Sequence, residues 1–375
     1  MKRFAGGLGV GIAITSCIIT TVLAQRTAAP SIQNLAGKIM TVAGPIDPSA
    51  LGQTLTHEHI FIDFKAPPSM VPPVTGVSVL KGSQPGPAGG GGLTDFDESL
   101  AEISEFKKIG GGTIVDVTNF GLTRDPEALL RVSRASGLHV VMGAGWYQKA
   151  LHPPDMAQRT VEELTAIVVR DVTTGAQGTS IRSGIIGEVG VNGRPLVDNE
   201  LKSVRASARA ARITGAPMML HSFATNDEMM TVLDIIASEG VDLSRVVMGH
   251  SGGKDMEYTK RLFQRGVFVE WDYMGQAPLP PAADAQRIES IAAVINAGYA
   301  DHVLLAHDVC TKAQLKRNGG GGYTYISNVI LPGLKAKGIS DETLRKIMVD
   351  NPRRALTFVA PQAAAAPQVA AAPKP

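Results

Sequence analysis

The segment TLTHEHIFIDF, residues 54–64, is the first of eight short runs rich in apolar and β-branched residues. Near-continuous apolar runs of this length are typical of parallel strands that are buried on both faces. The series therefore predicts eight buried parallel strands. The other seven runs are Thr113–Val117, Leu138–Met142, Gly184–Ile186, Pro217–Leu220, Arg245–Met248, Val267–Val269 and Asp301–Leu305.

Helical patterns separate these runs. They cover Asp95–Lys108, Pro126–Ser136, Thr160–Thr173, Asp198–Thr214, Asn226–Ser238, Met256–Arg265 and Asp284–Ala297, with a final pair at Tyr325–Lys337 and Asp341–Val349. Eight strands that alternate with helices over about 300 residues predict an α/β fold, a closed (β/α)8 TIM barrel. We expect it to form a single domain over residues 49–359. A doubly wound open sheet is the alternative architecture.

The first 24 residues have the pattern of a signal peptide. Lys2 and Arg3 precede an uncharged apolar run that ends at Leu23, and small residues stand at the expected cleavage site. This pattern predicts a periplasmic or secreted protein. Two other outcomes stay open, retention of the run as a membrane anchor and lipidation at Cys17.

The ends and the overall charge limit the remaining options. Residues 25–48 are expected to form a linker that leads into the barrel, and the Ala/Pro-rich residues 360–375 a disordered tail. After signal cleavage Cys310 would be the single cysteine, so no internal disulfide is expected. The formal net charge of +2, without a basic stripe, gives no case for nucleic acid. We expect a small-molecule substrate and no stable membrane association after cleavage, with a homodimer as one candidate assembly.

Four histidines and two acids stand at the ends of the predicted strands. His57 and His59 are two residues apart, so the period of a strand points both to one face, with Glu58 opposite. Two imidazoles side by side inside a barrel are unfavourable unless something binds them, and a metal ion is the obvious candidate. Because barrel strands end at one common mouth, we expect six side chains to meet there. The other four, each after an apolar run, are Glu188, His221, His250 and Asp308.

This ligand set indicates the kind and number of metal ions. Four imidazoles and two carboxylates suit Zn²⁺ first, with Mn²⁺, Co²⁺ or Fe²⁺ as alternatives. The set is too large for one tetrahedral ion and fits two ions that share a bridging carboxylate and a bridging water. Two such charges would lower the pKa of the water enough to supply hydroxide near neutral pH. Asp308, at the edge of the pair, is the expected acceptor of its proton.

In their order along the chain, these residues resemble the phosphotriesterase family of the amidohydrolase superfamily. The resemblance spans roughly Thr41 to Phe358 and includes Gly44-Pro45-Ile46, Leu55–His59, Gly187–Gly190, Gly249–Ser251 and Asn351-Pro352. It implies that His57, His59 and Asp308 bind the more buried metal ion. It further implies that His221 and His250 bind the more exposed ion and that Glu188 bridges the two.

One position departs from phosphotriesterase itself, which carries a carboxylated lysine where Glu188 stands in this chain. A glutamate at the bridge resembles the phosphotriesterase-related branch of the family. A direct carboxylate is shorter than a carboxylated lysine, so the metal ions or the strand must shift. Because of this difference, organophosphate hydrolysis is a weaker prediction for this chain than for phosphotriesterase itself. We expect carbonyl substrates ahead of phosphoryl substrates.

Aromatic residues after the third and seventh predicted strands are candidates for lining an apolar substrate pocket. They are Trp146, Tyr147, Trp271 and Tyr273. The leading hypothesis is a binuclear metal-dependent hydrolase in which a metal-bridging hydroxide attacks an ester, lactone, amide or phosphoester. A non-catalytic metal- or ligand-binding barrel is one alternative, and a metal-dependent barrel lyase or isomerase is the other.

Overall fold

The computed structural model describes residues 1, 33–65, 70, 91–276 and 281–362. Strands β1 (Ile39–Thr41) and β2 (Gly44–Ile46) pair antiparallel ahead of the barrel, so part of the expected linker is an ordered hairpin. Apart from Met1, the predicted signal peptide lies outside the described residues, and so does the tail beyond residue 362. The signal peptide and the periplasmic or secreted location stay predictions.

Eight parallel strands follow within the described residues. They form two ladders, one of β3, β4 and β5 and one that runs from β6 to β10 in order. The strands are β3 (Gln53–Glu58), β4 (Gly111–Asp116), β5 (His139–Met142), β6 (Ile186–Val191), β7 (Met218–Ser222), β8 (Val246–Gly249), β9 (Phe268–Trp271) and β10 (Val303–Leu305).

Two seams join these ladders. Between β5 and β6, the Gly187 N–H donates to the Ala144 carbonyl at 2.9 Å. Between β10 and β3, the Asp308 N–H donates to the His57 carbonyl at 3.1 Å. Backbone bonds at both seams close the sheet on itself, which confirms the TIM barrel and excludes the open sheet.

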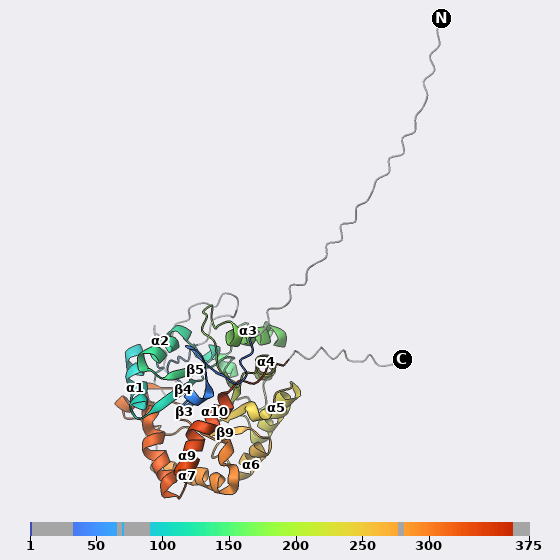
Figure 1. Ribbon diagram of the computed structural model, residues 1–375. Helices are drawn as coiled ribbons and strands as arrows, with labels where there is room; N and C mark the ends of the chain where they lie inside the picture. Colours follow the sequence, from blue (N-terminus) through green and yellow to red (C-terminus); the bar gives the residue numbers. More distant parts are fainter. Residues whose placement is uncertain (2–32, 66–69, 71–90, 277–280, 363–375) are drawn as a thin grey trace, which may run out of the picture. The chain divides into compact units, whose positions relative to one another are not determined.

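Helices surround the strands (Figure 1). They are α1 (Phe96–Lys108), α2 (Pro126–Ser136), α3 (Val161–Thr173), α4 (Asp198–Thr214), α5 (Asn226–Ser238), α6 (Met256–Gln264), α7 (Pro281–Val294), α8 (Leu331–Ala336), α9 (Asp341–Arg345) and α10 (Asn351–Leu356). Thr160 and Thr225 form capping boxes that fix where α3 and α5 begin. Among the described residues, no helix combines the length and apolar character needed to cross a bilayer.

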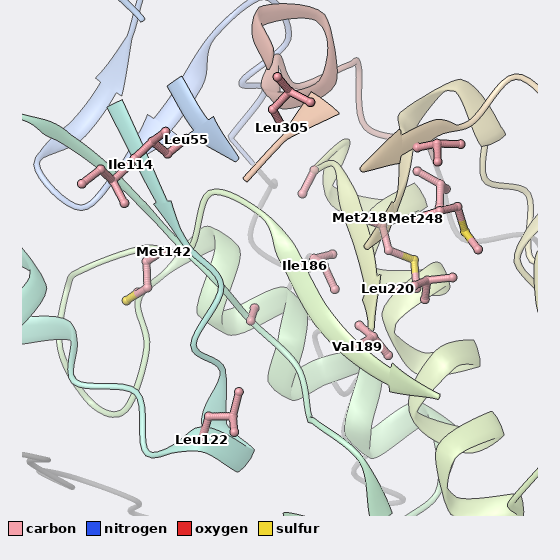
Figure 2. Packing of buried hydrophobic residues seen from close by; sticks show 14 of the residues in the cluster. Leu55, Ile114, Leu122, Met142, Ile186, Val189, Met218, Leu220, Met248 and Leu305 are labelled. Atoms are coloured by element: carbon pink, nitrogen blue, oxygen red, sulfur yellow. The ribbon is translucent and has the colours of Figure 1, made fainter. Parts of the chain in front are cut away.

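The barrel interior is apolar below its mouth. Alternate strand residues point the other way and pack beneath the helices, among them Met218 and Leu220 in Figure 2. Because Met219 between them points inside, the strand period places His221 inside as well, one layer nearer the mouth. The interior cluster consists of Ile39, Leu51, Val115, Val117, Val141, Ile185, Met219, Val247, Phe268, Leu304, Ala355 and Leu356.

Some predicted strand limits are wrong in a way that affects the site. The predicted strand Gly184–Ile186 is replaced by β6, so Glu188 lies within a strand rather than after it. His221 likewise lies within β7. These two predictions ended with the apolar run, but polar side chains that face the barrel mouth continue the ladder. The first strand is shorter than expected and ends at Glu58.

Arg124 and Asp171 form a buried ion pair beside the seam between β5 and β6. Their side chains are 1% and 5% exposed, and Arg124 Nη2 lies 2.7 Å from Asp171 Oδ2. Arg124 also donates from Nη1 to the Gly143 carbonyl at 2.7 Å and from Nε to Gln177 Oε1 at 2.9 Å. The guanidinium therefore links the end of β5 to α3.

We expect Arg124→Ala to lower the free energy of unfolding by about 3–5 kcal/mol, because Asp171 would stay buried with only a longer contact, at 3.5 Å, to the half-exposed Arg170. Lys260→Ala is the control, since Lys260 pairs with Glu257 on the surface. Its loss should change stability by roughly 1 kcal/mol or less. Urea denaturation followed by circular dichroism measures both, and equal losses in the two variants would contradict the assignment.

Candidate metal centre

The six side chains expected to bind metal lie together at the C-terminal mouth of the barrel. They come from β3, β6 and β7, and from the residues that follow β3, β8 and β10. None of the six is more than 6% exposed. The set consists of His57, His59, Glu188, His221, His250 and Asp308.

Glu188 lies at the centre of this cluster. Its Oε2 is 3.2 Å from His57 Nε2 and 2.7 Å from His221 Nδ1. The same oxygen is 3.6 Å from His250 Nε2, whereas Oε1 is 3.4 Å from His59 Nε2. One carboxylate therefore contacts histidines from both ladders of the barrel.

Asp308 completes the group on the side of β3. Its Oδ1 lies 3.3 Å from His59 Nε2 and 3.8 Å from His57 Nε2. On the other side, His221 Nδ1 and His250 Nε2 are 2.9 Å apart. The cluster thus divides into a group of His57, His59 and Asp308 and a pair of His221 and His250, with Glu188 between them.

Opposite charges stabilise this buried cluster. Burial lowers the pKa of His57, but Glu188 and Glu270 outweigh that effect and hold its pKa well above the ordinary value. Burial also opposes ionisation of Glu188, yet His221 and His57 hold its pKa well below the ordinary range. An ionised carboxylate at this depth requires positive charge beside it, and divalent cations can supply that charge.

The donor atoms fit divalent cations. His57 Nε2 is buried and lacks a hydrogen-bond partner within the described part of the chain, although it faces Glu188. Ligand atoms of His57, His59 and Asp308 lie within 4.8 Å of one another, as do those of His57, Glu188 and His250. Imidazole nitrogens and carboxylate oxygens are common ligands of Zn²⁺. The first group could hold one ion, and His221 with His250 a second, with Glu188 bridging them.

Two further acids contact the outer nitrogens of two of the candidate ligand histidines. Glu270 Oε2 lies 2.8 Å from His57 Nδ1, and Asp272 Oδ2 lies 2.9 Å from His250 Nδ1. Carboxylates in such places fix the orientation of the ring and raise its basicity as a ligand. The sequence interpretation did not include them in the ligand set. Their i, i+2 spacing at a strand end is the signal that identified His57 and His59, so it could have found them.

A cavity of about 400 Å³ opens onto the cluster. Tyr147 and Tyr273 line it. The Tyr147 hydroxyl is 3.0 Å from His221 Nε2, and the Tyr273 ring stacks on His250 with centroids 4.8 Å apart. Other lining residues provide apolar and amide groups, among them Ile62, Phe64, Leu122, Phe223, Gln148 and Asn192.

Trp146 and Trp271 do not line this cavity, which corrects the prediction for these two residues. Trp271 Nε1 donates to Ser290 Oγ on α7 at 3.0 Å, so the indole faces the helices outside the barrel. Trp146 lines a separate small cavity together with Ile167 of α3. Trp146 directly precedes Tyr147, which lines the cavity, and Trp271 directly follows Glu270, which contacts His57. Because adjacent residues of an extended chain point to opposite sides, both tryptophans point away from the cavity.

Comparison with known proteins gives a consistent family match. A model of the phosphotriesterase family matches residues 37–356. The N-acetyltaurine hydrolase of Danio rerio is 34% identical over 351 residues, which cover 87% of this chain and 100% of that protein. The structure of a resiniferatoxin-binding protein from Rhodobacter sphaeroides has a TM-score of 0.76 and 35% identity, covering 86% of this chain and 96% of that one. A lactonase from Listeria monocytogenes has a TM-score of 0.73 and 26% identity, covering 86% and 99%.

The central position of Glu188 predicts that its removal releases metal. Protein loaded with Zn²⁺ should retain about two equivalents per chain, and Glu188→Ala about one or fewer. Glu102→Ala is the control, because Glu102 is a buried glutamate that bonds backbone N–H groups of Lys316 and Arg317 instead. Elemental analysis after removal of unbound metal measures all three. Full metal content in Glu188→Ala would contradict the bridging role.

Proposed function

Since this chain belongs to the phosphotriesterase family, a family of metal-dependent hydrolases, we propose that it cleaves carbonyl esters, lactones or amides with two divalent cations, Zn²⁺ first. The observation that carries the proposal is the Glu188 carboxylate, which contacts both the His57/His59 pair and the His221/His250 pair. A single carboxylate in that position is suited to bridging two ions.

The protein's own groups have separate tasks in such a reaction. Bound ions would polarise the substrate oxygen and lower the pKa of an attacking water molecule. Asp308 faces the cavity at the edge of the cluster and would accept the proton of that water. Burial raises the pKa of Tyr147 and of Tyr273 above the ordinary phenol value, so both stay protonated and neutral. They would present hydroxyl groups, not charges, to the substrate.

Two observations favour carbonyl substrates over phosphotriesters. Glu188 is a direct and shorter bridge than the carboxylated lysine of phosphotriesterase, so the reacting centre would be differently spaced. Two relatives that are named for their substrates point the same way, whereas a third is named a phosphotriesterase. One is an N-acetyltaurine hydrolase, which by its name acts on an N-acyl amide, and another is a lactonase.

We expect the Zn²⁺-loaded protein to hydrolyse at least one member of a panel of lactones, esters and N-acyl amides with a higher kcat/KM than paraoxon. An advantage of about tenfold corresponds to roughly 1.4 kcal/mol of transition-state stabilisation. Product formed in H₂¹⁸O should contain the solvent oxygen, which a lyase or isomerase would not incorporate. Faster turnover of paraoxon would overturn the substrate order. Metal-replete protein that is inactive on the whole panel would favour a binding protein.

Replacement of the proton acceptor should lower kcat more than it changes KM. We expect Asp308→Asn to reduce kcat by about 10²- to 10⁴-fold, the usual contribution of a positioned general base. Asp301→Asn is the matched control, because Asp301 lies just before β10, at the opposite end from Asp308, and pairs with Lys346. Steady-state kinetics with metal content measured on the same samples would decide the matter. Unchanged kcat in metal-replete Asp308→Asn would exclude the assigned role.

A further inference from the structure

Glu58 lies between the two first histidines of the cluster but points away from them. Its Oε1 accepts the His307 backbone N–H at 2.9 Å and contacts His307 Nδ1 at 2.7 Å. Its Oε2 accepts the Val309 N–H at 3.1 Å. Both Glu58 and His307 are fully buried. The carboxylate therefore binds the residues immediately before and immediately after Asp308.

Asp308 is the residue at the apex of this turn. Its φ of +54° lies in the left-handed region, which a residue with a side chain adopts only when its surroundings enforce it. Its N–H donates to the His57 carbonyl at 3.1 Å, and its carbonyl accepts from Gln314 Nε2 at 2.8 Å. Together with the Glu58 bonds, these contacts fix the backbone on which the Asp308 carboxylate is carried.

The tautomer of His307 follows from its second contact. The Ile326 N–H donates to His307 Nε2 at 3.0 Å, so this nitrogen is an acceptor and carries no proton. Nδ1 must then carry the proton of the neutral ring and donate it to Glu58. His307 thus has one allowed orientation, in which it ties Glu58 on β3 to the segment after β10.

This arrangement lies at the seam where no regular ladder pairs β10 with β3 among the described residues. The Glu58 carboxylate provides hydrogen bonds that a ladder would otherwise provide. On the opposite side of the same backbone, His57 and His59 face Asp308. A metal ligand must be placed to within a few tenths of an ångström, so the seam contacts determine whether Asp308 can bind.

We propose that Glu58 and His307 are positioning residues that hold Asp308 at the metal centre. The inference rests on the proposed function in one respect, because Asp308 is there assigned as a ligand and as the proton acceptor. Neither residue lines the cavity, and neither offers an atom to the candidate ligand groups. Their effect reaches the centre only through the backbone of residues 307–309.

Three variants test this role. Glu58→Gln places an amide N–H₂ group against one of the backbone donors and should lower the affinity for one of two Zn²⁺ equivalents by about 10- to 100-fold. His307→Gln keeps both backbone bonds to Glu58 and is the second variant if Glu58→Gln does not fold. It should have a smaller effect of the same kind. Glu102→Gln is the control, since Glu102 also binds two backbone N–H groups of the segment after β10. It should bind both equivalents like the wild type.

Zn²⁺ affinity is measured by competition with a chromophoric chelator, and crystal structures of metal-free wild type and Glu58→Gln supply the second readout. In the variant, Asp308 Oδ1 should move away from His59 Nε2, which lies 3.3 Å from it in the native chain. An unmoved Asp308 with wild-type affinity would overturn the proposal, as would equal weakening in Glu102→Gln. If the wild type itself binds no Zn²⁺, the proposed function fails. The positioning role is then still tested by comparing the position of Asp308 in the two metal-free crystal structures.

Discussion

The contact of one buried carboxylate with four imidazoles is the interaction on which the rest of the structure depends. Glu188 is 2% exposed and approaches histidines that come from β3, β7 and β8 and their ends. Its charge is unfavourable at that depth unless cations lie beside it. The mouth of the barrel is therefore built around a requirement for positive charge, which protonated histidines or divalent cations can meet.

The barrel satisfies this requirement by stacking a polar layer on an apolar one. Met219 and Val247 fill the interior on β7 and β8. The next inward position on β7 is His221 itself, and the next inward position on β8 directly precedes His250. The two seams bring the strands of the separate ladders together around this layer. Arg124 stabilises one seam through Gly143, whereas at the other the bonds across β3 and β10 also place Asp308. The contacts that close the barrel at β10 and β3 thus also help to assemble the site.

Much of this could be predicted from the sequence, because the relevant signals are local. Apolar runs, capping residues and strand-end histidines are each encoded within a few residues. The predicted starts of α3 and α5, at Thr160 and Asn226, lie within one residue of the observed starts. Glu270 and Asp272 were missed despite a local signal, whereas two other failures concern information that is not local. Whether Trp271 faces the cavity or α7 depends on the twist and phase of β9, which composition does not reveal. Glu58, dismissed as pointing away, could gain a role only once its partners after β10 were known.

The account is tested most directly by anomalous X-ray diffraction at the zinc edge from crystals grown with Zn²⁺. It predicts two peaks on opposite sides of the Glu188 carboxylate, each about 2.0–2.2 Å from imidazole nitrogens or carboxylate oxygens. One peak should contact His57, His59 and Asp308, and the other should contact His221 and His250. A single peak would contradict the account. So would an ion bound instead by the group of His57, Glu270 and Asp272, whose ligand atoms also lie within 4.8 Å of one another.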